Sequence, residues 1–158
     1  MAMLLLAGCS DGSGQNWQTF KSPQWKFSAR FPGEVSEEAV TTFAQFQAAS
    51  DDADFRIMCS QVPPLSPKRA MAELLAMRDG AAESLHATVA ESKNIDVQGQ
   101  PAIEFTLNFS AGGADMVSYT RYLRCRNLLY QQIVTAPAGT NVEQDIRKFF
   151  ASLKVETQ

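Results

Sequence analysis

The strongest constraint on the fold is a strict alternation of apolar and polar residues in separate stretches of the chain. Residues 25–31 read WKFSARF and are followed by Pro32-Gly33, and residues 103–109 read IEFTLNF. Successive side chains of a β-strand point to opposite faces, so each stretch predicts a strand with one buried face. We therefore expect a sheet with a hydrophobic core against one side.

Two hairpins are expected in the same sheet. Residues 40–46 and 53–62 are rich in β-branched and aromatic residues, and the polar turn at residues 50–52 separates them. In residues 115–137, Arg126-Asn127 fits a two-residue turn in which asparagine tolerates a positive φ. That turn predicts that Cys125 lies beside Leu128, and Leu123 beside Tyr130. A further short strand is expected near Val89.

Two amphipathic helices are expected. Ser66-Pro67 supplies an N-cap and a proline at the first helical position, and an apolar stripe runs from Met71 to Leu85. The second helix follows Asn141 as N-cap, with Gln144 completing a partial capping box. Its apolar side is expected to pack on the sheet through Val142, Ile146, Phe149, Phe150 and Leu153.

Size and charge limit the classes of function. The 158 residues fit one domain, and a net charge of −3 with scattered charges offers no basic surface for nucleic acid. The densest basic group is Arg121, Arg124 and Arg126, which we interpret as a solvated strand end. Nucleic acid is therefore not an expected partner.

The order of four segments resembles the PsbP-like family, which includes bacterial lipoproteins and the extrinsic photosystem II subunit. The segments are ARFPG, GQPAIEFTL, RYLRCRNLLYQQIVTAP and KFFASLKV. The resemblance implies an α+β fold with an antiparallel sheet of about six strands sandwiched by helices, as one domain over residues 17–158. It also implies an accessory or scaffold role rather than catalysis. These segments are packing and turn residues, so they carry no family binding site or cofactor to this chain.

The first residues resemble a bacterial lipoprotein signal. Leu6-Ala7-Gly8-Cys9 matches the lipobox, so residues 1–8 are expected to be a signal peptide whose start lies further upstream. Cys9 then carries acyl chains such as palmitate, and residues 9–16 form a flexible tether. The expected location is the bacterial cell envelope, anchored to a membrane and facing the periplasm. The alternative is a frayed apolar terminus with a chance cysteine.

Lipidation of Cys9 leaves two other cysteines, Cys59 and Cys125. Disulfides persist in oxidising compartments, and both cysteines are expected on neighbouring elements of one domain, so we expect a disulfide between them. The alternative is a pair of buried thiols.

The sequence predicts no catalytic, cofactor-binding or metal-binding residue. His86 is the only histidine, and it is expected at a helix end; the alternative is a small envelope hydrolase that uses His86 with Ser84 or Ser92. The acids in residues 51–54 are expected to be solvated rather than to bind a cation, although a small-ligand or metal-binding protein stays an alternative.

The aromatic residues near the tether, Trp17, Phe20 and Trp25, fit either packing of the first strands or an exposed patch for a partner. We expect a non-catalytic accessory or binding module that presents one face of the sheet sandwich. Its partner is an envelope protein or a small ligand.

Overall fold

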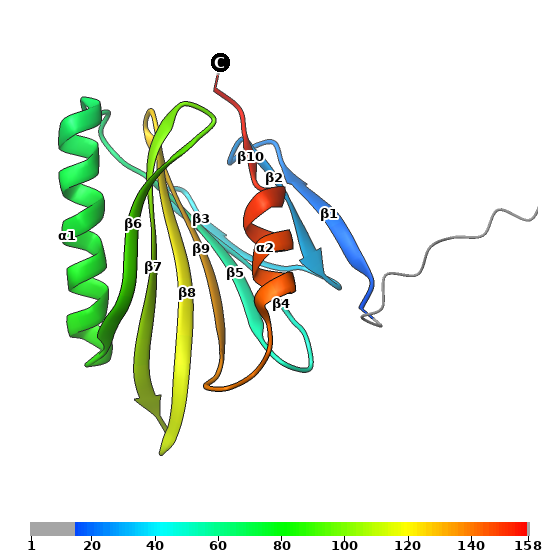
Figure 1. Cartoon of the computed structure of the whole chain (residues 1–158). Helices are drawn as coiled ribbons and strands as arrows, with labels where there is room; N and C mark the ends of the chain where they lie inside the picture. Colours follow the sequence, from blue (N-terminus) through cyan, green and yellow to red (C-terminus); the bar gives the residue numbers. More distant parts are fainter. Residues whose placement is uncertain (1–14, 158) are drawn as a thin grey trace, which may run out of the picture.

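The computed structural model describes residues 15–157, which form two antiparallel sheets and two helices in three layers (Figure 1). The large sheet has the strand order β3-β4-β5-β9-β8-β7-β6. Its strands are β3 Ser36–Val40, β4 Phe43–Ala49, β5 Asp54–Gln61, β6 Thr88–Val97, β7 Gln100–Ala111, β8 Ala114–Cys125 and β9 Leu128–Pro137. The small sheet consists of β1 Trp17–Ser22, β2 Phe27–Pro32 and β10 Lys154–Val155 in the order β1-β2-β10.

The helices lie on opposite faces of the large sheet. Helix α1, Pro67–Leu85, packs on β7 and β8, while α2, Glu143–Ser152, and the small sheet cover the other face, called the α2 side below (Figure 1). The expected α+β sandwich is confirmed, with seven strands in the main sheet rather than about six.

The hairpin at Arg126-Asn127 is confirmed. Cys125 pairs with Leu128, and Leu123 pairs with Tyr130. The positive φ of this turn, 56°, belongs to Arg126 and not to the asparagine that the sequence favours for it. The register is therefore as predicted, and the turn geometry differs in detail.

Helix α1 begins and ends where the sequence predicts. Ser66 is the N-cap residue, although its hydroxyl makes no capping hydrogen bond, and His86 ends the helix in the left-handed conformation. The buried residues of α1 are Ala70, Leu74 and Ala82. Leu85, the last residue of the predicted stripe, is 42% exposed, so the packed face ends before it.

Two strands differ from the prediction. Residues 40–46 are not one strand, because the chain turns at residues 41–42 and Val40 pairs with Phe43 across β3 and β4. Strand β6 has ten residues instead of a short segment near Val89. Both β3 and β6 are edge strands with mostly exposed side chains, so they lack the apolar alternation that marks a half-buried strand.

The start of α2 also differs. Val142 is its N-cap residue and no side chain caps the helix, so the expected capping box from Asn141 is not formed. Val142 is only 3% exposed, and its burial in the core fixes how the chain enters the helix. Four of the five predicted apolar residues are buried, and Ile146 is half-buried.

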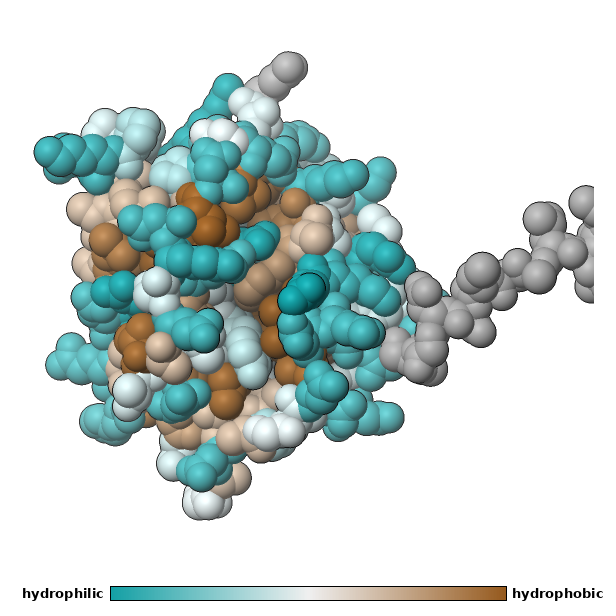
Figure 2. All heavy atoms as spheres, in the orientation of Figure 1, coloured by the Kyte–Doolittle hydropathy of each residue, from teal (hydrophilic) through white to brown (hydrophobic). Residues whose placement is uncertain are grey.

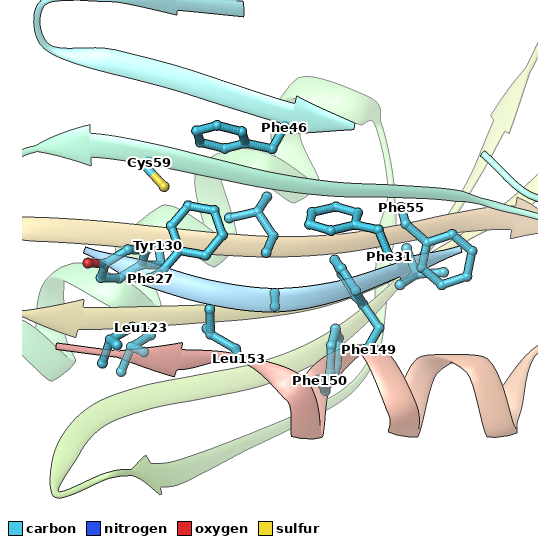
Figure 3. Packing of buried hydrophobic residues seen from close by; sticks show 14 of the residues in the cluster. Phe27, Phe31, Phe46, Phe55, Cys59, Leu123, Tyr130, Phe149, Phe150 and Leu153 are labelled. Carbon is cyan, nitrogen blue, oxygen red and sulfur yellow. The ribbon is translucent and has the colours of Figure 1, made fainter. Parts of the chain in front are cut away.

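An aromatic core fills the space between the large sheet and the α2 layer. Phe149 lies against the rings of Phe31 and Phe55, and its ring centroid is 5.3 and 5.4 Å from theirs (Figure 3). Trp25 is buried, and Trp17 and Phe20 pack against the same core. The packing interpretation of these first aromatic residues is confirmed, and the exposed aromatic patch is not formed.

The disulfide expected between Cys59 and Cys125 is not formed, and both are free buried thiols. Strand β9 lies between β5 and β8, which carry the two cysteines, so these are not neighbouring elements. Strands lie about 4.8 Å apart, which puts residues two strands away at roughly 9.6 Å. That exceeds the Cα separation of about 7 Å that a disulfide can bridge without movement of the backbone.

We expect both thiols to be unreactive in the folded protein and reactive once it unfolds. Burial raises the pKa of Cys59 and of Cys125, so the reactive thiolate is suppressed as well as shielded. The test is thiol counting on the Cys9→Ser variant without reductant, first in buffer and then in urea. Two thiols are expected in urea and almost none in buffer. Fewer than two in urea would contradict the free-thiol state.

Candidate functional site

An open groove lies between α2 and the strands β6, β7 and β8. Its volume is about 870 Å³. The floor carries side chains of β7 and β8, one wall is α2, and the other wall is the edge strand β6. Figure 2 shows this face of the molecule, with brown and pale side chains between teal ones in the space between the front strands and α2.

A row of four polar residues crosses the sheet at one end of this groove. Lys93 pairs with Glu104, Glu104 with Arg121, and Arg121 with Gln132, each across one strand boundary from β6 to β9. Directly opposite residues of antiparallel strands project to the same face. The register alone therefore places all four side chains in one line on the α2 side.

The charged members of the row are linked through one carboxylate. The guanidinium of Arg121 donates from Nη2 to Oε1 of Glu104 at 2.5 Å and from Nε to the same oxygen at 3.0 Å. The ammonium of Lys93 lies 2.9 Å from Oε2 of Glu104. The side chains of Arg121 and Glu104 are mostly buried, whereas that of Lys93 is exposed.

The inner members of the row hold the last turn of α2. Arg121 donates from Nη1 to the carbonyl of Phe150 at 2.7 Å, and Gln132 donates from Nε2 to the carbonyl of Phe149 at 3.0 Å. These carbonyls belong to the last turn of the helix, where no further turn supplies regular N–H partners and where the negative pole of the helix dipole lies. The carbonyl of Phe149 also accepts from the hydroxyl of Ser152 at 2.8 Å, and that of Phe150 from the amide of Leu153 at 3.5 Å. No basic residue lies in the last turn of α2 itself, so the cation of Arg121 compensates this pole from the sheet.

The ion pairs change the acidity of Glu104. Burial opposes ionisation of this carboxyl group, but hydrogen bonds and charge from Arg121 and Lys93 outweigh it and lower its pKa from the ordinary value of 4.5. Glu104 is therefore an anion at neutral pH. It is bound to two cations, so it is suited to organising the groove and poorly suited to accepting a substrate proton.

The next row along the sheet gives the open part of the floor. Glu91, Thr106 and Tyr119 pair in register, and all three line the groove. Facing them on the α2 wall are Ile146 and Arg147, whose guanidinium pairs with Glu143 one turn earlier. The surface thus combines an aromatic hydroxyl, a small hydroxyl and apolar area, which suits contact with a partner.

The predicted solvated group of arginines is wrong for two of its three members. Arg121 belongs to the row above, and Arg124 is 3% exposed, donating from Nη2 to the carbonyl of Pro63 at 2.6 Å and lying 3.3 Å from a carboxylate oxygen of Glu73. Only Arg126, in the turn, is exposed. Strand alternation in the sequence places Arg121 and Arg124 on opposite faces. The partners of these two arginines come from distant segments, and the sequence does not show that those segments lie beside them.

The structure does not bring His86 into a hydrogen bond with either serine proposed for a hydrolase. His86 lies at the end of α1, beside a second hollow of about 680 Å³. Ser84 is exposed on α1, and the hydroxyl of Ser92 accepts a hydrogen bond from Arg78 at 2.8 Å. Within residues 15–157, no hydrogen bond joins His86 to a serine hydroxyl.

The remaining predicted sites lie in the acidic turn before β5 and in the N-terminal segment. Asp51, Asp52 and Asp54 are exposed, and no group of three potential metal ligands occurs in the part of the chain that the structure describes.

Cys9, residues 1–8 and most of the tether lie outside the described residues. Among residues 15–157, neither helix combines the length and the apolar character needed to cross a membrane.

Comparison with known proteins gives the fold. No protein-family model and no curated protein matches the sequence of this chain. The solution structure of cyanobacterial PsbP (CyanoP) from Synechocystis is similar, with a TM-score of 0.62 over 96% of this chain and 99% of that protein at 12% identity. The Saccharomyces cerevisiae Ran-binding protein Mog1p matches with a TM-score of 0.58 over 90% and 96% at 10% identity.

A crystal structure from Bacteroides thetaiotaomicron has the same arrangement over part of its length. Its TM-score is 0.59 at 18% identity over 87% of this chain, which spans 48% of the Bacteroides protein. The PsbP-like fold expected from the sequence is therefore confirmed by three proteins of low identity. At these identities the likeness establishes the fold alone.

The polar row predicts that the folded protein loses stability in acid, because Glu104 becomes protonated there. Its folded pKa lies below 4.5, so the folded state binds this proton less readily than the unfolded chain does. The stabilisation is complete above pH 4.5 and is lost as pH falls through the lowered folded pKa. We expect Glu104→Gln to remove this part of the acid dependence, measured by urea unfolding at a series of pH values.

At pH 7 the same variant should lower the free energy of unfolding by about 1.5–3 kcal/mol, since Arg121 loses a charged hydrogen-bond partner. Glu143→Gln, which removes an exposed carboxylate from the α2 wall, is the matched control and should change little. An identical acid limb for wild type and Glu104→Gln would contradict the role given to this row.

Proposed function

We propose that this protein is a lipid-anchored, non-catalytic binding module of the bacterial cell envelope, and that its groove between α2 and β6–β8 receives an envelope protein. The observation that carries the binding role is the groove itself. It is open, and the row Lys93–Glu104–Arg121 holds its ionised floor groups in fixed pairs. A rigid surface of this kind loses little conformational freedom when a partner binds.

The chemistry of the groove favours a polar, near-neutral partner surface. Its cations Lys93, Arg121 and Arg147 are balanced by the anions Glu91, Glu104 and Glu143. Such a balance does not attract a polyanion or a polycation over distance. Tyr119 and Ile146 add amphipathic and apolar contact area, as binding surfaces commonly do.

The anchor is supported by the sequence. Leu6-Ala7-Gly8-Cys9 matches the lipobox pattern, and the small polar residues that follow suit a tether. Acylated Cys9 would hold the domain at a membrane surface and limit its search for partners to that surface. We propose the periplasmic side as its location, with palmitate-type chains as the anchor.

The fold likeness supports a binding role without supplying the partner. Mog1p is a Ran-binding protein, so this fold serves protein recognition in at least one case. We take from it only that the sandwich can present a protein-binding surface.

The groove is tested by filling it. Thr106 lies half-buried on the floor of the groove, so the larger side chain of Thr106→Trp should block the space. Crosslinking in native envelopes should then capture the partner at least tenfold less well. A tenfold loss is roughly the effect of losing one well-packed contact. Thr135→Trp is the matched control, because Thr135 projects from β9 on the opposite face. The proposal fails if no protein is captured reproducibly, or if only Thr135→Trp reduces capture.

The anchor is tested separately. Mass spectrometry of protein extracted from membranes should find acyl chains on Cys9 as the new first residue, and Cys9→Ser should release the protein from the membrane fraction. Ser10→Cys in the Cys9→Ser background is the control for position, since it moves the thiol by one residue and breaks the lipobox spacing. An unmodified Cys9 within an uncut terminus contradicts the anchor and leaves the groove proposal standing.

A further inference from the structure

Strand β6 offers a long unpaired edge beside the groove. It is the last strand of the large sheet, and among residues 15–157 it pairs only with β7. A bulge between Val89 and Glu91 interrupts its start, and residues 91–97 then pair regularly. An edge of this length exposes a row of main-chain donors and acceptors that only another extended chain or water can satisfy.

The hairpin turn shows which main-chain groups face outward. Gln98 and Gly99 both have positive φ, 52° and 76°, which is the two-residue type I′ geometry. The flanking pair Val97 and Gln100 then exchanges both main-chain hydrogen bonds, and bonded and non-bonded pairs alternate from there. The amides and carbonyls that point away from β7 are therefore those of Ser92, Asn94 and Asp96.

The side chains along this edge are amphipathic. On the α2 side, Ile95 and Val97 are half-buried and pack against the aromatic core. On the other side, Ser92, Asn94 and Asp96 are exposed. A strand added here would continue the same pattern, with apolar residues toward the α2 side and polar residues away from it.

We propose that β6 binds an extended segment of the partner protein as an additional antiparallel strand of the large sheet. This inference rests on the proposed binding role and names the class of ligand, an amphipathic strand of about seven residues that matches positions 91–97. An acidic side chain opposite Lys93 and a basic one opposite Glu91 complete its pattern. Its side chains on the α2 side lie along the β6 wall of the groove, which Glu91 and Lys93 form.

The charges on β6 disfavour a second copy of this chain as the added strand. Two identical edges pair antiparallel about a two-fold axis, and residues facing each other lie on the same side of the sheet. An axis at Lys93 sets two like charges opposite each other, which is destabilising. An axis at Asn94 sets Lys93 opposite the apolar side chain of Ile95, and an axis at Ile95 sets it opposite that of Val97.

Of the axes at residues 92–95, only the one at Ser92 sets opposite charges against each other, and its overlap is short. An axis at Ser92 sets Glu91 opposite Lys93, but the bulge before Glu91 limits the regular overlap to residues 91–93. The edge is thus poorly matched to itself and open to a strand of complementary sequence, which points to a different protein as the occupant.

The test uses a synthetic peptide and the full chain carrying Cys9→Ser. The peptide reads Val-Lys-Val-Thr-Glu-Thr-Lys, which in the antiparallel direction sets Val opposite Val97 and Ile95, Glu opposite Lys93 and Lys opposite Glu91. Amide hydrogen exchange followed by NMR should show new protection at Ser92, Asn94 and Asp96. The amides of Lys93 and Ile95, already bonded to β7, should change little.

Proline at position 94 isolates the main-chain contact. Asn94→Pro removes an outward amide without removing a bond to β7, a place where edge strands tolerate proline. It should weaken peptide binding about tenfold or more, the scale of one to two lost hydrogen bonds. Asn94→Thr keeps the amide and should bind as the parent does, and a circular dichroism spectrum equal to the parent's verifies that the proline variant folds.

Several results would overturn strand addition. One is a folded Asn94→Pro protein that binds the peptide as tightly as the parent does. Another is amide protection that does not alternate along β6. A third is equally tight binding of a peptide that has the same composition but carries the residues of its two faces exchanged. Concentration-dependent dimerisation that Asn94→Pro abolishes would make a second copy the occupant instead. Envelope capture that survives Asn94→Pro but not Thr106→Trp would reject the strand and keep the groove.

Discussion

The structure depends on how the large sheet holds the last turn of α2. Arg121 and Gln132, adjacent in one row, donate to the carbonyls of Phe150 and Phe149 in the last turn of α2, where the regular N–H donors of the helix end. The polar row thereby fixes the position of the end of α2 on an otherwise apolar face of the sheet. Once the helix is fixed there, its two phenylalanines enter the aromatic core, and the chain beyond it reaches β2 as strand β10.

The same row explains why a groove exists beside a well-filled core. Apolar side chains of β4, β5 and β9 pack against the small sheet and α2. In the same layer, Glu104 and Lys93 lie on the α2 side of β7 and β6. Charged side chains that are paired with each other do not draw a covering layer onto themselves. The sheet is therefore covered on part of this side and open on the rest, and the division follows the chemistry of the side chains.

Alternation predicted the half-buried strands well, since it reflects burial of one face, and the hairpin register that joins Leu123 to Tyr130 followed from turn chemistry. The edge strands β3 and β6 were missed or shortened because no layer imposes a pattern on them. The groove was not predicted, because its row joins side chains whose register depends on three separate hairpins. The disulfide prediction failed for a related reason: which strand lies between Cys59 and Cys125 is a property of topology.

The small sheet joins strands that are far apart in the sequence, and this separation affects the kinetics of folding. Phe27 of β2 pairs with Val155 of β10, and the side-chain amide of Gln98 further bonds both the amide and the carbonyl of Val155. Contacts between such distant residues form slowly, and only after residue 155 has been synthesised. During translation, the aromatic residues of β2 and β4 stay without their cover until α2 and β10 have been made, so this domain is expected to need a holding chaperone up to that point.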